Sequence, residues 1–244
     1  MPRFFVPSTG FDGESVTVTG DDAFHMARSL RMAVGDTVTV CDMQGREHLC
    51  RLDSLRDEVC HLTILSSRES NTEPPVEITL YMGYPKSDKL ELVIQKAVEL
   101  GASAIVPFFS ERCVKQPRAE REEKQNARQC RIAEEAAKQC GRARIPSVGK
   151  PISFFSVLQS VGEYDLVLFC YEGDGTRSAK EVLGAHRDAR RIAVIIGAEG
   201  GFSLAEAEAA VAAGCASVGL GPRILRCETA PLCILSCISY EFEL

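Results

Sequence analysis

The sequence predicts an α/β protein in which a small β-rich region precedes a larger, mostly parallel sheet. Over residues 1–70, apolar residues alternate with polar ones, which is the period of a half-buried strand. From residue 76 onward, apolar runs of strand length alternate with helical patterns, which is typical of a parallel sheet covered on both faces. We therefore expect a small β-barrel over residues 1–70 and an α/β domain over residues 74–244.

In the first region, the stretches "ESVTVTG", "DTVTVCD" and "VCHLTILSS" predict strands, because each alternates with period two and is bounded by glycine or aspartate turns. The interval Asp21 to Arg31 predicts one short helix. Residues 66–75, "SSRESNTEPP", are polar and end in two prolines, so we predict a linker there.

The second region begins with a predicted strand, "VEITLYMGY", and a predicted helix, "SDKLELVIQKAVELG". Ser87 is the predicted N-cap of this helix and Gly101 its C′ residue. Its apolar face would consist of Leu90, Val93, Ile94, Ala97 and Val98. Further strands are predicted at residues 104–109, 165–170, 192–196 and 217–220.

Ligands of parallel sheets bind beyond the carboxyl ends of the strands. Three segments are predicted to lie there: "FCYEGDG", "GAEGG" and "GLGPRILRCETA". The second segment is unusually bare, with Gly197, Gly200 and Gly201 around Ala198 and Glu199. Ser203 and Glu206 form a predicted capping box for the helix that follows.

Glycines at this place serve either a tight turn or a ligand that approaches the main chain closely. The spacing is neither G-x-G-x-x-G nor G-x-x-x-x-G-K-[ST], and an acidic residue in the turn disfavours a polyphosphate. A neutral or cationic ligand fits better. In the third segment, Arg223, Arg226 and Glu228 lie in a loop that looks buried, where charges need either ion-pair partners or a ligand.

Bulk composition narrows the class of protein. The net charge of −6 over 244 residues argues against non-specific coating of nucleic acid, although basic residues gather between Arg112 and Arg144. That stretch could contact phosphates locally or could be a solvated helix with i,i+4 pairs.

Eleven cysteines occur without a C-x-x-C pair, so we expect reduced thiols and no metal site, with Cys227, Cys233 and Cys237 packed in a C-terminal helix. No apolar run is long enough for a membrane span and no secretion signal is present, so we expect a cytoplasmic protein.

With these motifs assembled, the chain resembles the 16S ribosomal RNA (uracil-N3)-methyltransferase family of the SPOUT superfamily, called ribosomal RNA small subunit methyltransferase E. The resemblance is carried by "HMARSLRMAVGDTVTVCD", "KSDKLELVIQKAVELGASAIVPFFSERCV", "RIAEEAAKQCGRARIP", "IIGAEGGFSLAEAEAA" and "LGPRILRCETAPL". The chain departs from the family pattern at Ala198, usually proline, at Cys140, usually serine, and at Cys227, commonly threonine.

The resemblance implies a PUA-like, RNA-binding barrel over residues 1–70 and a SPOUT methyltransferase domain over residues 74–244 with a C-terminal trefoil knot. Pattern alone would give an unknotted sheet, since knots are rare. The resemblance further implies a homodimer formed through the knotted region. The implied cofactor is S-adenosylmethionine, held by Gly197, Ala198, Glu199, Gly200, Gly201, Leu220, Gly221, Ile224 and Leu225.

The implied substrate is 16S ribosomal RNA, within the 30S subunit, methylated at N3 of a uridine that is unpaired or flipped out. Arg226 would stabilise negative charge on the uracil, and Glu228 or Glu199 would receive the N3 proton. Candidate RNA contacts are Arg28, Arg31, Lys86, Lys89, Arg112, Arg142 and Arg223.

Two other functions stay open on the sequence. A non-catalytic RNA-binding or ribosome-assembly protein with a degenerate methyltransferase domain is supported by Ala198, which replaces a proline of the family pattern. A nucleotide-dependent phosphotransferase is disfavoured because the phosphate-loop lysine is missing.

Overall fold

The computed structural model describes residues 1–56, 58–86, 88–113 and 119–244. The chain forms two compact units. The first consists of residues 1–73 and 137–145, and the second of residues 74–136 and 146–244. Residues 137–145 lie far beyond the predicted end of the barrel in the sequence and nevertheless belong to the first unit.

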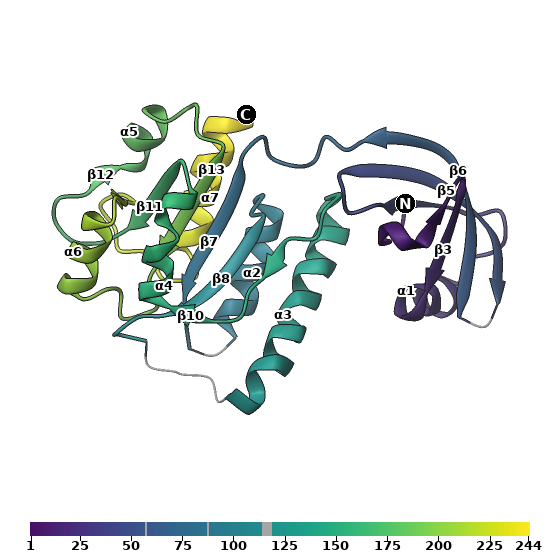
Figure 1. Ribbon diagram of the computed structural model, residues 1–244, viewed down its shortest axis with the longest axis horizontal. Coiled ribbons are helices and arrows are strands. Elements are labelled where there is room, and N and C mark those ends of the chain that lie inside the picture. The colour runs from purple at the N-terminus through teal and green to yellow at the C-terminus, as the bar shows by residue number, and fades with distance from the viewer. Residues whose placement is uncertain (57, 87, 114–118) are drawn as a thin grey trace. The chain divides into compact units, whose positions relative to one another are not determined.

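The first unit is built on a six-stranded sheet, shown in purple and blue in Figure 1. The strand order is β1 (Arg3–Phe5), β4 (Thr37–Cys41), β5 (Arg46–Arg56), β6 (Val59–Glu69), β3 (Ser15–Thr19) and β2 (Phe11–Asp12). Only β1 and β4 pair in parallel. Strands β3, β4 and β6 confirm the three predicted from alternation, whereas β1, β2 and β5 were not predicted.

One face of this sheet carries the core of the unit. Alternate residues such as Val16, Val38 and Leu52 are fully buried, as period-two strands require. The predicted short helix is found as α1 (Gly20–Phe24) continued by a π-helical turn, η2 (His25–Ser29), and Ala23 and Met26 from these turns complete the core. A short 3₁₀ turn, η1 (Ser8–Gly10), precedes β2.

The predicted linker over residues 66–75 is partly wrong. Strand β6 continues through Glu69, which pairs with Arg46 of β5. The polar residues Ser66 and Ser67 are exposed strand residues, so polarity there marks solvent exposure and not the end of the ladder.

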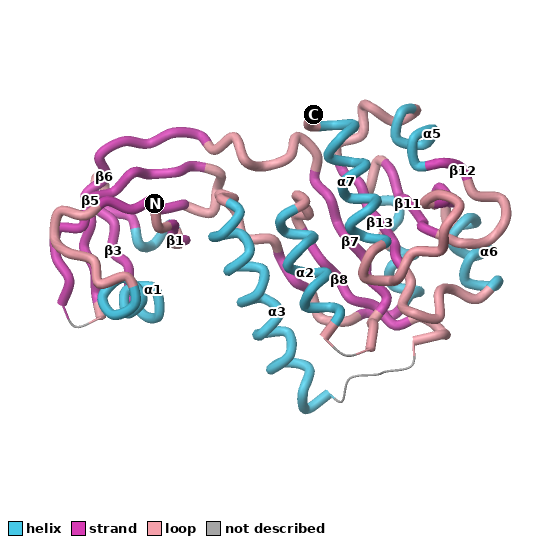
Figure 2. Tube along the Cα trace, turned by 180° about the vertical axis from the view of Figure 1, so that it is seen from behind, coloured by secondary structure: helices cyan, strands magenta, loops and turns pink. Residues whose placement is uncertain are grey.

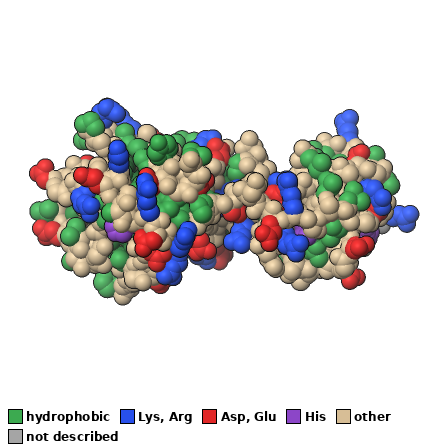
Figure 3. Space-filling view, turned by 90° about the horizontal axis from the view of Figure 1, so that it is seen from above, with side chains coloured by type: hydrophobic (Ala, Val, Ile, Leu, Met, Phe, Trp, Pro, Cys, Tyr) green, Lys and Arg blue, Asp and Glu red, His purple; other side chains and the backbone are tan. Residues whose placement is uncertain are grey.

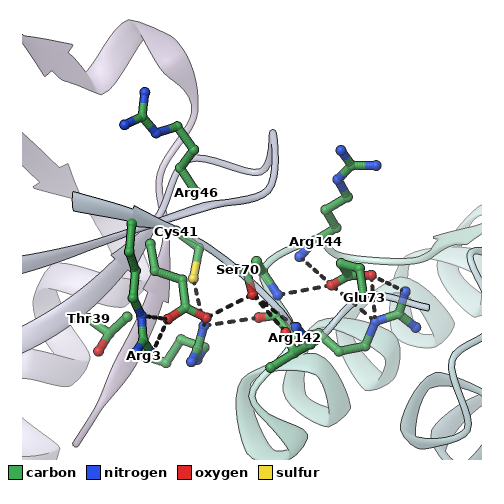
Figure 4. Close-up of polar contacts among 12 residues, drawn as sticks. Arg3, Thr39, Cys41, Arg46, Ser70, Glu73, Arg142 and Arg144 are labelled. Carbon is green, nitrogen blue, oxygen red and sulfur yellow. Dashed lines mark hydrogen bonds and ion pairs between the residues drawn. The ribbon is translucent and has the colours of Figure 1, made fainter. Parts of the chain in front are cut away.

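Residues 137–145 are held in the first unit by a partly buried ion pair and by hydrogen bonds (Figure 4). Arg142 Nη2 lies 2.6 Å from Glu73 Oε2, and the backbone N–H of Ala143 donates to Glu73 Oε1. Arg3 Nη1 donates to Glu47 Oε1 at 2.8 Å and to the Arg142 carbonyl at 3.3 Å. Arg142 is only 4% exposed and its guanidinium is bonded to Glu73, so it is not the accessible RNA contact that the sequence predicts.

The second unit is a parallel sheet covered by helices. Its strand order is β10 (Ile152–Ser153), β8 (Ala104–Phe109), β7 (Glu77–Gly83), β13 (Arg191–Ile196), β11 (Leu166–Cys170), β14 (Ala216–Gly219) and β12 (Arg177–Ser178), with β9 (Ser147–Val148) also on β8. Every pair is parallel, as the alternation of strands and helices predicts. The five longer strands were predicted, whereas β9, β10 and β12, of two residues each, were not.

Helices cover both faces of this sheet. They are α2 (Lys89–Glu99), α3 (Ala119–Cys140), α4 (Phe154–Gln159), α5 (Ala179–Gly184), α6 (Leu204–Ala212) and α7 (Ala230–Phe242), with a 3₁₀ turn, η3 (Val161–Glu163). Helices α4 and α6 lie in front of the sheet in Figure 1, and α2 and α7 lie in front of it in Figure 2, which is seen from behind. The last residues of α3 belong to the first unit. Within the described ranges, no helix has the length and apolar character to cross a membrane.

Helix α2 confirms the predicted pattern in detail. All five residues of its predicted apolar face are buried, and Gly101 has a φ of 89°, as a C′ glycine should. Asp88 occupies the N-cap position, and Ser87, the predicted N-cap, lies outside the described residues. The trefoil knot stays a prediction, because the strand order alone does not establish how the C-terminal segment is threaded.

The ion pair between Arg142, which is buried, and Glu73, which is partly buried, generates a stability prediction. Arg142→Ala leaves the Glu73 carboxylate without its cation, so we expect the free energy of unfolding to fall by about 3 kcal/mol. Arg144→Ala is the matched control, because its exposed guanidinium makes one bond to the Gln44 carbonyl and its loss costs about 1 kcal/mol or less. Urea unfolding measures both variants, and equal losses would contradict the ion pair.

Candidate active site

Three strands bring three loops to one edge of the sheet. Strand β11 lies between β13 and β14, and its last residue, Cys170, is in register with Ile196 and with Val218. Because the strands are parallel and end together, the segments that follow them start side by side. They surround a cavity of about 500 Å³, a size usual for a small-molecule site.

The cavity brings together most of the predicted cofactor residues. Eight of the nine line it, and only Gly200 does not: Gly197, Ala198, Glu199, Gly201, Leu220, Gly221, Ile224 and Leu225 are on its wall. Arg223 and Arg226 also line it. The sequence predicts that "FCYEGDG", the segment around the end of β11, lies at this edge, but none of its residues is among the predicted site residues. That segment contributes Tyr171 and Glu172 to the wall, and Thr176, the next residue after it, lines the cavity as well.

The bare turn, residues 197–201 after β13, is packed tightly against neighbouring segments of the chain. A Cβ atom at Gly83, the last residue of β7, would lie 2.4 Å from the Ala198 nitrogen. A Cβ at Gly200 would lie 2.9 Å from Arg112 Cβ and 3.0 Å from the Arg112 carbonyl oxygen. Gly201 has a φ of 62°, which L residues rarely adopt. The expectation that all three glycines serve a ligand is therefore corrected for Gly200, whose missing side chain makes room for Arg112.

The helix after the turn is capped as predicted. Ser203 Oγ accepts from the Glu206 backbone N–H, and the Glu206 carboxylate accepts from the Ser203 N–H, which completes a capping box. Glu206 Oε1 also accepts from the Glu111 N–H at 2.7 Å, and Arg112 Nη1 donates to the Gly200 carbonyl at 3.3 Å. The segment after β8 is thus bonded to the turn that lines the cavity.

Both glutamates predicted as proton acceptors are bound to one lysine. Lys89 Nζ lies 3.1 Å from Glu199 Oε1 and 3.2 Å from Glu228 Oε2. The Lys86 backbone N–H also donates to Glu199 Oε1, at 3.1 Å. Glu199 lines the cavity, whereas Glu228 is not part of its wall. The Lys89 ammonium, predicted as an RNA contact, is occupied by these two carboxylates.

These contacts keep both carboxylates ionised. Burial works against ionisation of Glu199, but hydrogen bonds from its own N–H, the Lys89 ammonium and the Lys86 N–H outweigh it, and its pKa is lowered. The pKa of Glu228 is lowered chiefly by a bond from its own N–H, with help from Cys227 and Lys89 against some desolvation. The bonds from Lys89 to Glu199 and Glu228 in turn raise the pKa of the lysine.

Cys227 is placed differently from the prediction. It is buried, but it precedes α7, whereas Cys233 and Cys237 lie within that helix. Its thiol donates to Glu228 Oε2 at 3.2 Å, and burial raises its pKa to about 12, so it is a neutral hydrogen-bond donor. All eleven cysteines are free thiols. In the part of the chain that the structure describes, no cluster of His, Cys, Asp and Glu could hold a metal ion.

The other predicted RNA contacts are exposed. Arg28 and Arg31 lie on the first unit, and Lys86, Arg112 and Arg223 on the second. On the face seen in Figure 3, Lys and Arg side chains are interspersed with Asp and Glu and do not gather in one patch. Arg223, which is exposed and also lines the cavity, is the candidate placed nearest to the site.

Comparisons with known proteins identify the family. Residues 72–239 match the model described as an RNA methyltransferase domain, and residues 18–65 match the model described as an RNA methyltransferase PUA domain. The ribosomal RNA small subunit methyltransferase E of Bacillus subtilis is 35% identical, over 100% of this chain and 98% of that protein. The chain belongs to the ribosomal RNA small subunit methyltransferase E family.

Other members of the family match over most of their length. The protein of the same name from Synechocystis is 33% identical, over 94% of this chain and 74% of that protein. A crystal structure of ribosomal RNA small subunit methyltransferase E from Neisseria gonorrhoeae, bound to S-adenosyl methionine, is 31% identical with a TM-score of 0.83 and covers 98% of this chain and 97% of that one. The family resemblance and the α/β fold preceded by a PUA domain are confirmed.

The close approach of β7 to the turn generates a second prediction. Gly83→Ala would drive a methyl group into the Ala198 nitrogen, so we expect the free energy of unfolding to fall by about 1–3 kcal/mol. Gly184→Ala is the control, because a Cβ there meets nothing within 4 Å and alanine favours the helix α5. Urea unfolding compares the two, and a Gly83→Ala variant as stable as the control would contradict the packing described.

Proposed function

We propose that this chain transfers a methyl group from S-adenosylmethionine to N3 of a uridine in 16S ribosomal RNA. The observation that carries the proposal is the cavity at the carboxyl edge of β11, β13 and β14, in a chain of this methyltransferase family. The small-subunit ribosomal RNA after which its relatives are named and the methyl donor bound to the Neisseria protein support the same substrate and donor.

The cavity fits the methyl donor in size and in chemistry. Apolar side chains of Ile196, Leu220 and Leu225 offer contacts for the adenine, and backbone groups of the bare turn offer hydrogen bonds. The wall carries two carboxylates, Glu172 and Glu199, and two arginines, Arg223 and Arg226, so it offers groups of both signs to a donor that has a cationic sulfonium and a carboxylate. When bound, S-adenosylmethionine supplies an electrophilic methyl group, and the role of the cavity is to position it.

The protein must also make the uracil N3 nucleophilic, since its lone pair becomes available only as the imide proton leaves. Arg226, on the wall of the cavity, would stabilise the negative charge that spreads onto the carbonyl oxygens of the base. Of the two predicted proton acceptors, Glu199 is the better candidate, because it lines the cavity and Glu228 does not.

A uridine in a duplex hides N3, so the target base would be unpaired or flipped out. We propose Arg28, Arg31, Lys86, Arg112 and Arg223 as contacts to the RNA, because all five are exposed. The match of residues 18–65 to a PUA domain of RNA methyltransferases supports a role for the first unit in holding the RNA.

Three finer points of the proposal follow from the family resemblance. The substrate would be 16S ribosomal RNA within the 30S subunit, the active form would be a homodimer joined through a knotted C-terminal region, and the protein would work in the cytoplasm. Buried apolar residues of α7, such as Ile234 and Leu235, are compatible with a threaded C-terminal helix.

The non-catalytic alternative has weaker support. Only Ala198 favoured it, but this residue is 6% exposed and packed against Gly83, so the turn holds its conformation without a proline. A nucleotide-dependent phosphotransferase is not supported either, because the sequence has no phosphate-loop lysine in the G-x-x-x-x-G-K-[ST] spacing.

The function is tested with purified protein, labelled S-adenosylmethionine and two substrates, naked 16S RNA and 30S subunits, both from a strain that lacks this methylation. Mass spectrometry of nuclease digests should reveal one new methyl group, on N3 of a single uridine. Donor binding without methyl transfer to either substrate would favour the non-catalytic alternative. A methyl group on another base would overturn the assigned reaction.

Arg226→Ala tests the proposed charge stabilisation. We expect methyl transfer to fall by at least about a hundred-fold, while affinity for S-adenosylmethionine, measured by calorimetry, changes little. Arg190→Ala is the control, because that exposed arginine precedes β13 at the opposite edge of the sheet. Equal loss of binding and transfer would mean that Arg226 maintains the structure of the loop instead.

A further inference from the structure

Within the described ranges, Lys89 is the one residue whose side chain forms ion pairs with both Glu199 and Glu228. It is the first residue of α2, and its ammonium lies 3.1 Å from Glu199 Oε1 and 3.2 Å from Glu228 Oε2. The lysine side chain is 29% exposed and each glutamate side chain is 26% exposed. Pairs with this degree of shielding are screened less by salt than fully exposed ones.

The two glutamates, Glu199 and Glu228, lie in different loops at this edge of the sheet. Glu199 lies in the bare turn after β13, between Ala198 and Gly200. Glu228 lies two residues after Arg226, in a turn closed by bonds from the Thr229 and Ala230 N–H groups to the Arg226 carbonyl. One ammonium thus joins the turn that would hold the methyl donor to the turn that carries Arg226, which would face the base.

We propose that Lys89 is a positioning residue, which couples the donor-binding turn to the Arg226 turn by sharing its ammonium between Glu199 and Glu228. This inference rests on the function proposed above. Without the lysine, two carboxylates on neighbouring loops would repel each other, and the loops would separate until the two glutamates act independently. With it, the loops hold one relative arrangement, and Arg226 is kept at the wall of the cavity.

Two further contacts favour this role over an RNA contact. The Lys86 N–H donates to Glu199, so the start of α2 is bonded to the donor turn by its backbone as well. The Cys227 thiol donates to Glu228 Oε2, the same oxygen that Lys89 contacts, and the Cys227 sulfur lies 3.9 Å from Lys89 Nζ. A phosphate would have to compete with two preformed carboxylate partners for this ammonium.

The test measures coupling between the two glutamates in the full-length chain. Affinity for S-adenosylmethionine alone is determined by calorimetry for wild type, Glu199→Gln, Glu228→Gln and the double variant, in the presence of Lys89 and in Lys89→Met. With Lys89 present, the fold-loss of donor affinity in the double variant should differ by about five-fold or more from the product of the fold-losses in the two single variants. In Lys89→Met the losses should multiply to within about two-fold, as for independent sites.

Companion variants separate positioning from general damage. Lys89→Met should weaken donor affinity and lower kcat, each by about ten-fold, and Lys89→Arg should recover most of both, since a guanidinium can bridge two carboxylates. Lys96→Met, in the last turn of α2 and paired with Glu99 among the described contacts, should change neither. If Lys89→Met does not fold, the coupling measured with Lys89 present still decides the matter.

The outcomes distinguish this inference from the proposed function. No donor binding by the wild-type protein would overturn the function itself. If the protein binds the donor, but the affinity losses of the two glutamate variants simply multiply, only the role of Lys89 is overturned. A Lys89→Met variant with normal donor affinity and a raised KM for RNA would overturn it as well, and would make Lys89 an RNA contact.

Discussion

The site depends on the register of three neighbouring parallel strands. Strand β11 is in register with β13 on one side and β14 on the other, so that Cys170, Ile196 and Val218 reach the edge of the sheet together. The segments that follow these three strands therefore start side by side, although they are far apart in the sequence. The cavity lies between these three segments, and residues from each of them line it.

The bare turn after β13 has to satisfy two demands at once. Its outer side packs against the protein, where Gly83 approaches the Ala198 nitrogen and Arg112 fills the space beside Gly200. Its inner side presents backbone and the Glu199 carboxylate to the cavity. Packing holds the turn still, so a ligand would not have to order it on binding, and this favours affinity.

Much of the fold is encoded in short-range patterns. Alternation and helical period predict β3, β4, β6, α2 and the five longer strands of the parallel sheet, because each element buries one consistent set of residues. Very short strands such as β9 and β12 carry no period of their own, since they form only by pairing with a neighbour. The sequence pattern does not reveal that β6 continues beyond Ser66, because the residues there are polar and solvent-exposed and show no alternation.

The site is predictable in part. Loops at the ends of strands identify the residues around Gly197 and Leu220, but charges in a sequence do not reveal their partners. Arg142 and Lys89 have the composition of RNA contacts and instead form ion pairs with Glu73, and with Glu199 and Glu228. These partners lie many residues away, and only the fold brings them together.

The most direct test of the central claim is a crystal structure of this chain grown with S-adenosylmethionine. The donor should lie in the cavity between the segments that follow β11, β13 and β14, in contact with Gly197, Leu220 and Leu225. A donor bound elsewhere, or segments that lie apart with the cavity filled by side chains of the protein, would contradict it.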